Sequence, residues 1–595
     1  MTTATVPGPA AASAPRRRER VNRPGSPALA VLSLALWLFG LHPIAPGQMD
    51  SVGLIDQLSL ILLVAYPILL AAVVIELAAQ RPRQRLIAAY TALGVLFVYG
   101  LQPASEQIAR ISVAWLHAGF ARYIADHGQA LGSYDGRFSW PGFFSLGAFV
   151  SRAGGQADLT SLLQWAPVVL AGLATLGMRA LAVAVLGADR RAWIATWLFL
   201  LTEWTEQDYF SPQATTYVLM LGGLALTVQY LVRPGPGMLL SPRPRGRAVP
   251  LNTPRDRLVA QAAVLLIALG LAPSHQLTPF MFAGALLVML LTGWLWAAWL
   301  PWVVLIPALA WFCLGARDFW QGQLKLVIGD VGRIGSSVDQ GLSQRFVGDA
   351  GRTFILDVRV GLTCVVALLA AGGWWWLRSR GIRSWALPLL AVAPFGLIAL
   401  QSYGGEVFLR CFLFALPFAA ILASLPLDDL LATTRPGMRA GALALVVVLL
   451  TGLGLATVTA RGGNDAYTSL SRADLAAVQF AYRHAAPGQT IGGLTGDLPL
   501  GYARIGEVRP ISFEGTCHEL TGMDSCILDR ASTFLVVTPS QENAGRIYYG
   551  YPAGWTGRLV RQLIASGKYQ LVYTQDDSLV LADVTAGAGV SGNAP

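Results

Sequence analysis

Residues 54–74 read LIDQLSLILLVAYPILLAAVV, an apolar run that carries one charged side chain, Asp56. A helix that crosses the ~30 Å hydrocarbon layer of a membrane needs about 20 such residues, so this run predicts a membrane-spanning helix. The rest of the chain has the same character, since 54% of its 595 residues are hydrophobic, 13% are charged and the mean hydropathy is +0.53. Ordinary soluble domains do not reach these values. The sequence therefore predicts a polytopic α-helical membrane protein.

The number and direction of the spans follow from the apolar windows and the arginines between them. Arginine-rich segments fall on alternate connections, at residues 16–18, 81–85, 190–191, 233–257, 378–383 and 435–439. Basic residues near span ends stay in the cytoplasm, so we expect a multi-pass protein of the cell membrane with a cytoplasmic N-terminus and an extracytoplasmic C-terminus. About thirteen windows occur, beginning near Ala28, Leu54, Leu86, Ser161, Ala192, Ala214, Leu258, Thr278, Leu295, Phe354, Ala386, Val407 and Ala442.

Composition divides the chain into four parts. We expect residues 1–26 to be a disordered basic cytoplasmic segment, 27–460 the transmembrane bundle, 461–585 an extracytoplasmic α/β domain and 586–595 a disordered tail. Two long outer loops, 103–160 and 316–353, contain amphipathic stretches that suit the membrane surface or a packed loop. The second loop has mixed charge and is either a phosphate-facing lid or a solvated loop. The net charge of +10 is spread over short arginine clusters, which argues against nucleic acid as a partner.

The predicted C-terminal domain has helical patterns at 473–484 and 557–566 and strand patterns at 490–494, 534–538, 569–573 and 579–581. Cys517 and Cys526 are the cysteines outside the predicted spans, and eight residues separate them. An oxidising compartment makes a disulfide between them plausible, and two free thiols are the alternative. The aromatic residues of segment 548–555 form either a carbohydrate-stacking surface or a patch that packs on the bundle.

Four polar clusters fall at span ends on the predicted outer side. An ionisable group at membrane depth is retained mainly where it has a partner or a task. The first cluster contains Asp50, which is a general base, a metal ligand or the N-cap of the second span. The second cluster, residues 203–213, contains Glu203, Glu206, Asp208 and Tyr209 between two apolar spans. Three carboxylates in six residues beside aromatic side chains are hard to explain as a mere turn.

The third and fourth clusters offer groups that bind phosphate. Residues 273–279 contain His275 and Gln276, and the histidine either binds phosphate, carries a proton or is hydrogen-bonded locally. Glu406 and Arg410 of the fourth cluster are four residues apart and form either a structural pair or, through the arginine, a planar donor fork for a lipid-linked phosphate. No Gly-rich nucleotide loop, nucleophile elbow or HExxH motif occurs. The functional hypothesis therefore requires the four clusters to meet in space.

The chain combines many spans, long outer loops and a C-terminal extracytoplasmic domain with Asp50 in the first outer loop and carboxylates at Glu203, Glu206 and Asp208 after a later span. In these features it resembles the GT-C superfamily of integral-membrane glycosyltransferases. Protein mannosyltransferases and arabinosyltransferases are examples. The resemblance covers nearly the whole chain at the level of architecture. It implies transfer of a sugar from a polyprenyl-phosphate-linked donor to a glycan, lipid or protein acceptor of the cell envelope. Members use a first-loop carboxylate as base or metal ligand, and Asp50 occupies that place without a paired acidic residue beside it.

The reaction implied by the resemblance assigns a role to each candidate. An acceptor hydroxyl must lose its proton while an anionic polyprenyl phosphate departs. We expect Asp50 to be the base and Glu206 or Asp208 to orient the acceptor, and Asp50 and Asp208 are the candidate ligands if a divalent metal ion takes part. The groups expected to bind the substrate and its phosphate are Tyr209, His275, Gln276, Glu406 and Arg410.

Two other classes of protein compete with this interpretation. A transporter or flippase for lipid-linked or polysaccharide substrates predicts internal repeats with broken spans, and no clear repeat is present. A non-catalytic membrane scaffold, whose C-terminal domain binds a partner, predicts outer carboxylates that do not share a cavity.

Overall fold

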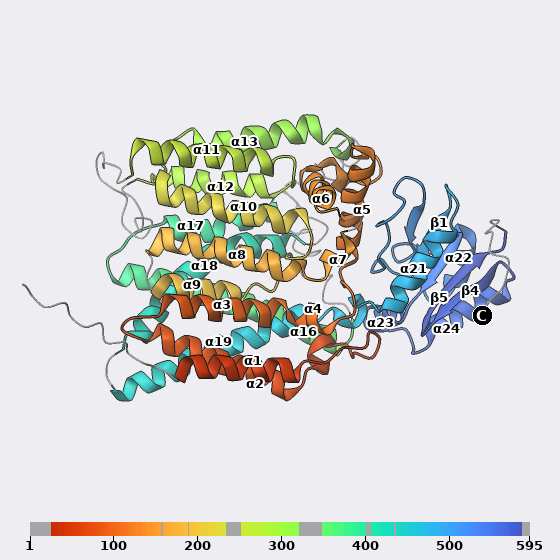
Figure 1. Ribbon diagram of the computed structural model, residues 1–595, viewed down its shortest axis with the longest axis horizontal. Helices are drawn as coiled ribbons and strands as arrows, with labels where there is room; N and C mark the ends of the chain where they lie inside the picture. Colours follow the sequence, from red (N-terminus) through yellow and green to blue (C-terminus); the bar gives the residue numbers. More distant parts are fainter. Residues whose placement is uncertain are drawn as a thin grey trace, which may run out of the picture.

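The computed structural model describes residues 25–155, 159–187, 190–233, 252–320, 348–399, 406–433 and 436–585. Long helices lie side by side in a bundle, and a smaller domain with a β-sheet lies at one end of it (Figure 1). Four of the predicted regions lie wholly or mostly outside the described residues. They are the two terminal segments predicted to be disordered, most of the predicted lid in loop 316–353, and residues 401–405 of the fourth polar cluster.

Each predicted apolar window overlaps a helix of the bundle. The helices are α1 (Gly25–Gly40), α2 (Leu60–Leu77), α3 (Gln84–Tyr99), α8 (Ala166–Leu186), α9 (Arg190–Leu200), α10 (Pro212–Leu226), α11 (Pro254–Leu271), α12 (Thr278–Leu291), α13 (Leu300–Ala310), α16 (Ala350–Ser379), α17 (Ala386–Val392), α18 (Val407–Leu431) and α19 (Pro436–Gly462). Short helical turns continue four of these or precede them, namely η1 (Gly53–Gln57), η3 (Thr227–Leu231), η5 (Trp311–Gly315) and η7 (Ala393–Ala399).

The outer surface of the bundle is apolar. Leu60, Phe39, Trp375 and Leu314 are more than 70% exposed, with values of 79%, 78%, 74% and 75%. Large apolar side chains that face outward in such numbers require a lipid environment, because water would drive them into contact with other apolar surfaces. Six helices are long and apolar enough to cross a membrane, namely α2, α8, α10 with η3, α16, α18 and the segment from Gly437 through Thr468. The chain is a membrane protein, while the number of thirteen spans stays a prediction.

Helix α18 lies at the centre of the bundle. Its residues are apolar around the whole circumference, and nearly all of those from Cys411 to Leu425 are buried against α9, α16 and α17. A helix that is hydrophobic on every face is stable only when other helices surround it. This position places Glu406 and Arg410, at the start of α18, in the interior of one end of the bundle.

Among the described residues, arginines of two predicted inner connections lie at the other end. Arg190 and Arg191, the first two residues of α9, contact the Asp428 carboxylate near the end of α18, at 2.5 and 2.9 Å. Arg439, in the first turn of α19, donates to the carbonyl oxygen of Ala78 after α2. Helix α19 then leads over 27 residues, or ~40 Å, to the small domain. The basic clusters and the small domain therefore lie at opposite ends of the bundle.

The predicted outer loop 103–160 folds into helices between the bundle and the small domain (Figure 1). They are α4 (Leu101–Ser105), α5 (Ser112–His127), η2 (Gly136–Ser139) and α6 (Gly142–Ala153), and α7 (Thr160–Leu163) leads into α8. Helix α5 packs directly on the small domain at Gly119. A Cβ atom there would lie 2.4 Å from the carbonyl oxygen of Gly501 and 2.7 Å from the Cα of Tyr502, so this approach requires glycine.

The small domain contains a mixed five-stranded sheet in the order β2-β1-β3-β5-β4, where β1 is parallel to β2 and β3, and β5 is antiparallel to β3 and β4. The two helices and four strands predicted from the sequence are present. Strand β2 and helices α20, α22 and α23 were not predicted. The elements are α20 (Asp465–Thr468), α21 (Arg472–His484), β1 (Thr490–Gly493), β2 (Arg509–Ser512), α22 (Met523–Arg530), β3 (Phe534–Val537), α23 (Pro539–Tyr549), α24 (Trp555–Ala565), β4 (Tyr569–Gln575) and β5 (Ser578–Asp583).

The two alternatives left open for this domain have definite outcomes. Cys517 and Cys526 form a disulfide, with Cα atoms 5.8 Å apart. Of the predicted aromatic surface, Trp555 is buried in the core of the domain and Tyr548 packs on Tyr467, which follows α19. Tyr549 remains 43% exposed. Most of this patch therefore serves packing.

Candidate functional site

A polar cavity of about 260 Å³ lies at the domain-proximal end of the bundle. Three of the four predicted polar clusters contribute to it, and the predicted substrate-binding residues Tyr209, His275, Gln276, Glu406 and Arg410 all line it. The α5–α6 segment supplies the remaining wall. Other lining residues are Val113, His117, Arg137, Trp140, Gln207, Ser211, Pro212, Gln213 and Ser274.

The turn between α11 and α12 fixes the tautomer of His275. Its Nδ1 accepts hydrogen bonds from the backbone nitrogens of Leu277 at 3.3 Å and Thr278 at 3.1 Å. Backbone N–H groups can only donate, so Nδ1 carries a lone pair and the proton of the neutral ring is on Nε2. Burial and then the charge of Arg410 lower the pKa of His275 to about 3, which keeps the ring neutral. His275 therefore offers one N–H donor.

His117, on α5, has the complementary arrangement. Its Nδ1 lies 2.9 Å from the carbonyl oxygen of Phe210, which can only accept, so the proton of the neutral ring is on Nδ1. Burial lowers the pKa of His117 to about 4. Its Nε2 is thus a lone-pair acceptor, and no partner for this atom occurs among the described residues. The cavity contains one imidazole donor and one imidazole acceptor.

The sequence left two roles open for Arg410, a structural pair with Glu406 and a donor fork for phosphate, and its contacts are compatible with both. Its Nη2 donates to Glu406 Oε2 at 2.8 Å, which is the i,i+4 pair, and its Nη1 donates to Gln207 Oε1 at 2.9 Å. The side chain is 12% exposed and lines the cavity. Arg137 is a second cation at the cavity wall and pairs with Asp135 at 2.6 Å. Two guanidinium groups and a neutral imidazole N–H make this part of the cavity suitable for an anion.

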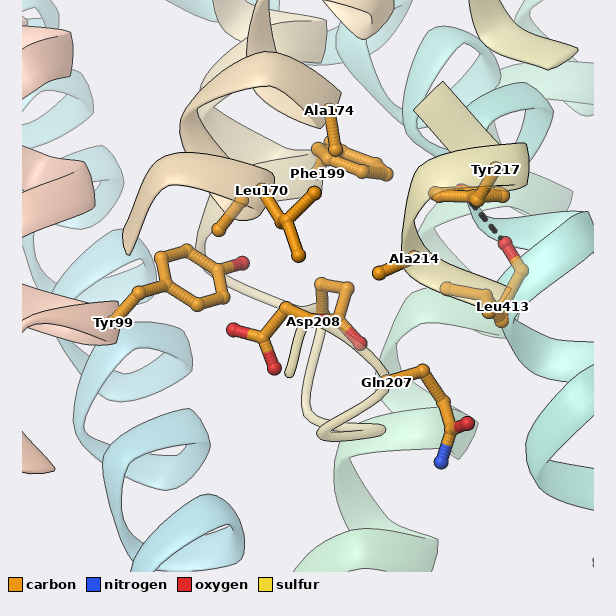
Figure 2. Close-up of a pocket in the computed structure, with 11 residues that line it drawn as sticks. Tyr99, Leu170, Ala174, Phe199, Gln207, Asp208, Ala214, Tyr217 and Leu413 are labelled. Atoms are coloured by element: carbon orange, nitrogen blue, oxygen red, sulfur yellow. Dashed lines mark hydrogen bonds between the residues drawn. The ribbon is translucent and has the colours of Figure 1, made fainter. Parts of the chain in front are cut away.

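The turn between α9 and α10 sends alternate side chains in different directions. Gln207 and Tyr209 line the polar cavity, whereas Glu206 and Asp208 do not. In the close-up, Asp208 is directed toward Tyr99 and Gln207 extends away from it (Figure 2). Glu206 has a positive φ of 56°, a conformation that costs a residue with a side chain about 1–3 kcal/mol and persists where surrounding contacts hold it.

The carboxylates of this turn belong to a buried network of ion pairs. Arg461, near the end of α19, is 2% exposed and donates to Glu203 at 3.3 Å and to Asp208 at 2.8 Å. Burial raises the pKa of Glu203 to about 7. Beside the turn, apolar side chains such as Leu170 and Phe199 line a small pocket of about 20 Å³ together with Asp208 (Figure 2).

A second arginine extends the network to the small domain. Arg110, before α5, pairs with Glu206 and donates from Nη1 to Asp465 at 2.6 Å, and Arg359 of α16 lies 3.7 Å from Glu206. Burial and the neighbouring carboxylate of Asp465 raise the pKa of Glu106, which lies 3.9 Å from Arg110. Through these ion pairs, Glu206 and Asp208 join the turn between α9 and α10 to α16, α19 and the α4–α5 connection.

Asp50 lies apart from the other candidates. Its side chain is exposed, accepts a hydrogen bond from the backbone nitrogen of Val52 at 2.9 Å, and does not line the polar cavity. The neighbouring Gly47 packs against Pro539 of the small domain. The first outer loop is therefore held near that domain, and the role of Asp50 as a base stays a prediction.

The residues present do not fit the metal site suggested by the sequence. Asp208 is paired with Arg461, and neither Asp50 nor Asp208 lines the polar cavity. No group of three or more histidine, cysteine, aspartate or glutamate side chains within the described ranges is arranged to hold a metal ion. We derive no step through a metal ion.

Sequence reasoning missed His117, Arg137, Gln207 and Gln213. Gln207 and Gln213 lie in the predicted second cluster, where the carboxylates drew attention instead. His117 and Arg137 lie in the predicted surface loop, and no local pattern indicates that this segment folds over the bundle end.

No family model matches the sequence, and no curated protein matches it. Two solved structures resemble the fold. One is the archaeal oligosaccharyltransferase AglB from Archaeoglobus fulgidus in complex with an inhibitory peptide and a dolichol-phosphate, with 12% identity, a TM-score of 0.47 and coverage of 84% of this chain and 74% of that chain. The other is ArnT from Cupriavidus metallidurans bound to undecaprenyl phosphate, with 15% identity, a TM-score of 0.46 and coverage of 87% and 100%. At these identities and TM-scores we base the function on the cavity.

Proposed function

We propose that the protein is a membrane glycosyltransferase that transfers a sugar from a polyprenyl-phosphate-linked donor to a cell-envelope acceptor on the outer face of the membrane. The observation that carries this proposal is the polar cavity at one end of an otherwise apolar bundle, with Arg410, Arg137 and His275 in its wall. These groups suit the phosphate of a lipid-linked donor, whose lipid tail would remain in the surrounding bilayer.

The orientation of the protein is part of the proposal. Arg190 and Arg191, which contact Asp428, lie at the end of the bundle opposite the cavity. Because such clusters stay in the cytoplasm, the cavity and the small domain are assigned to the outer face. The disulfide between Cys517 and Cys526 fits an oxidising compartment.

Arg410 and His275 have the chemistry needed at the leaving group. The guanidinium neutralises the phosphate, and the His275 Nε2–H donates to one of its oxygens as negative charge develops. Both groups are held before substrate binds, Arg410 by Glu406 and Gln207 and His275 by the backbone of α12. Fixed donors of this kind need no rearrangement when the sugar–phosphate bond breaks.

Two groups are assigned as candidates for the base. Asp50 is the carboxylate of the first outer loop that the resemblance favours, and His117 offers a lone pair on Nε2 inside the cavity. Asp50→Asn and His117→Gln distinguish them, because the variant that lacks the base loses transfer while it retains binding of the donor.

The proposal is tested with the purified full-length protein in nanodiscs. Undecaprenyl phosphate, the lipid bound in the Cupriavidus metallidurans structure, serves as the binding probe, and its radiolabelled sugar derivatives serve as donors. Arg410→Gln is expected to weaken undecaprenyl phosphate binding by about 10-fold to 100-fold, because a charge-assisted hydrogen bond contributes about 1.5–3 kcal/mol.

The matched control is Arg122→Gln, which alters a 47% exposed arginine on α5 that pairs with Asp126. Binding should be unchanged in this variant. Equal affinities for wild type and Arg410→Gln would contradict the phosphate site. Movement of the intact lipid-linked sugar across the bilayer without its release would favour the flippase alternative.

A further inference from the structure

The side-chain amide of Gln213 is buried, and it has no hydrogen-bond partner in the part of the chain that the structure describes. It lies in the first turn of α10, is 4% exposed and lines the polar cavity. Neither its Oε1 nor its Nε2 has a partner among the described residues. A buried amide without partners costs about 1–3 kcal/mol for each unsatisfied group, so such a side chain points to a ligand that completes its bonds.

The groups around Gln213 indicate a neutral ligand with several hydroxyl groups. The amide offers two N–H donors and an acceptor oxygen, and His117 Nε2 offers a second acceptor. A phosphate oxygen accepts hydrogen bonds and cannot satisfy Gln213 Oε1 or His117 Nε2. A sugar hydroxyl donates and accepts at once, so adjacent hydroxyls on one ring match both sides of an amide.

Size and shape agree with one sugar ring. The cavity volume of about 260 Å³ leaves room for a ligand much larger than one water molecule. Trp140 and Tyr209 contribute aromatic surface to the wall, and aromatic faces pack well against the apolar C–H face of a sugar. Arg410 lies in the same cavity and is available to the phosphate attached to that sugar.

We propose that Gln213 is a specificity-determining residue that binds two adjacent hydroxyl groups of the donor sugar. The proposal rests on the proposed function, because it assumes that the sugar is delivered on a lipid phosphate. It adds that the donor sugar is neutral and carries hydroxyl groups at the two positions that the Gln213 amide binds. The cavity then discriminates between sugars by the groups at those two positions.

The test separates the sugar from the phosphate. Binding to the full-length protein in nanodiscs is measured for undecaprenyl phosphate and for a panel of its neutral hexosyl and pentosyl derivatives. Gln213→Met, which keeps the volume and removes both hydrogen-bonding groups, should weaken the best derivative about tenfold and leave undecaprenyl phosphate within about twofold of wild type. Gln129→Met alters an exposed glutamine beyond α5 and should change neither affinity.

Deoxy analogues of the best sugar locate the contact. In wild type, removal of either of the two contacted hydroxyls should lower the affinity about tenfold, and in Gln213→Met the same analogues should bind as the parent sugar does. Deoxy analogues that remain as weak relative to their parent in the variant as in wild type would overturn the proposal. An equal loss for the sugar derivative and for undecaprenyl phosphate in Gln213→Met would also overturn it, because that pattern indicates a general change of the cavity. Absence of binding by undecaprenyl phosphate and all derivatives in wild type would instead refute the proposed function.

Discussion

Replacing Arg461 with methionine is expected to lower the free energy of unfolding by about 3–5 kcal/mol, the range for removal of one member of a buried ion pair. The guanidinium is 2% exposed and lies 3.3 Å from Glu203 and 2.8 Å from Asp208, so the substitution leaves two buried carboxylates without this cation. It also removes the contact between Arg461 and the ring of Tyr99 at 4.5 Å. Burial already raises the pKa of Glu203 to about 7, so proton uptake by Glu203 should place the loss at the lower end of the range.

Chemical unfolding in mixed micelles, followed by tryptophan fluorescence, measures the change. The control is Arg122→Met, which removes an exposed arginine 3.8 Å from Asp126 and should cost at most about 1 kcal/mol. Adding Glu203→Gln and Asp208→Asn to Arg461→Met should restore most of the lost stability, because the uncompensated charges are then gone. A loss in Arg461→Met no larger than in Arg122→Met would refute the assignment of these carboxylates to a structural network.

Three further predictions concern other parts of the molecule. In the folded protein the pKa of His117 is about 4, so between pH 6.5 and 5 the unfolded chain protonates this histidine and the folded one does not. Over this range the free energy of unfolding should therefore fall by about 2 kcal/mol more in wild type than in His117→Gln. Unfolding at both pH values measures the difference. Cys517→Ser should lower the unfolding free energy of the small domain by about 2–3 kcal/mol, and a reducing agent should have the same effect on wild type and none on the variant. Gly119→Ala should cost about 1–3 kcal/mol and increase proteolysis of the small domain, because the new Cβ meets the carbonyl oxygen of Gly501; unchanged proteolysis would contradict the tight α5 contact.

The architecture was predictable because its signals are local. An apolar run long enough to cross lipid is visible in any window, and the predicted windows overlap helices throughout the bundle. Alternate arginine clusters predicted a common end, and Arg190 and Arg191 share the Asp428 carboxylate, while Arg439 donates to the Ala78 carbonyl oxygen.

The candidate site was predictable only in part, because its geometry depends on tertiary contacts. The sequence brought Tyr209, His275 and Arg410 to one face, and the structure places all three in one cavity. The sequence did not indicate which carboxylates arginines would neutralise. Glu206 and Asp208 were predicted to be catalytic on residue type and position, yet their partners Arg110 and Arg461 are distant in the chain.

The other polar residues of the cavity, among them His117 and Gln213, were missed for the same reason. A histidine or glutamine has no periodic signature, and the importance of Gln213 follows from burial without a partner, which a sequence does not show. The tautomers of His117 and His275 follow from single backbone contacts with Phe210 and Thr278.

The most direct measurement is a cryo-EM structure of the protein in nanodiscs with undecaprenyl phosphate bound. The phosphate should lie in the polar cavity within hydrogen-bond distance of an Arg410 guanidinium nitrogen and of His275 Nε2, with Gln213 left for the sugar. Density for the phosphate at the other end of the bundle, among Arg190, Arg191 and Asp428, would contradict the account.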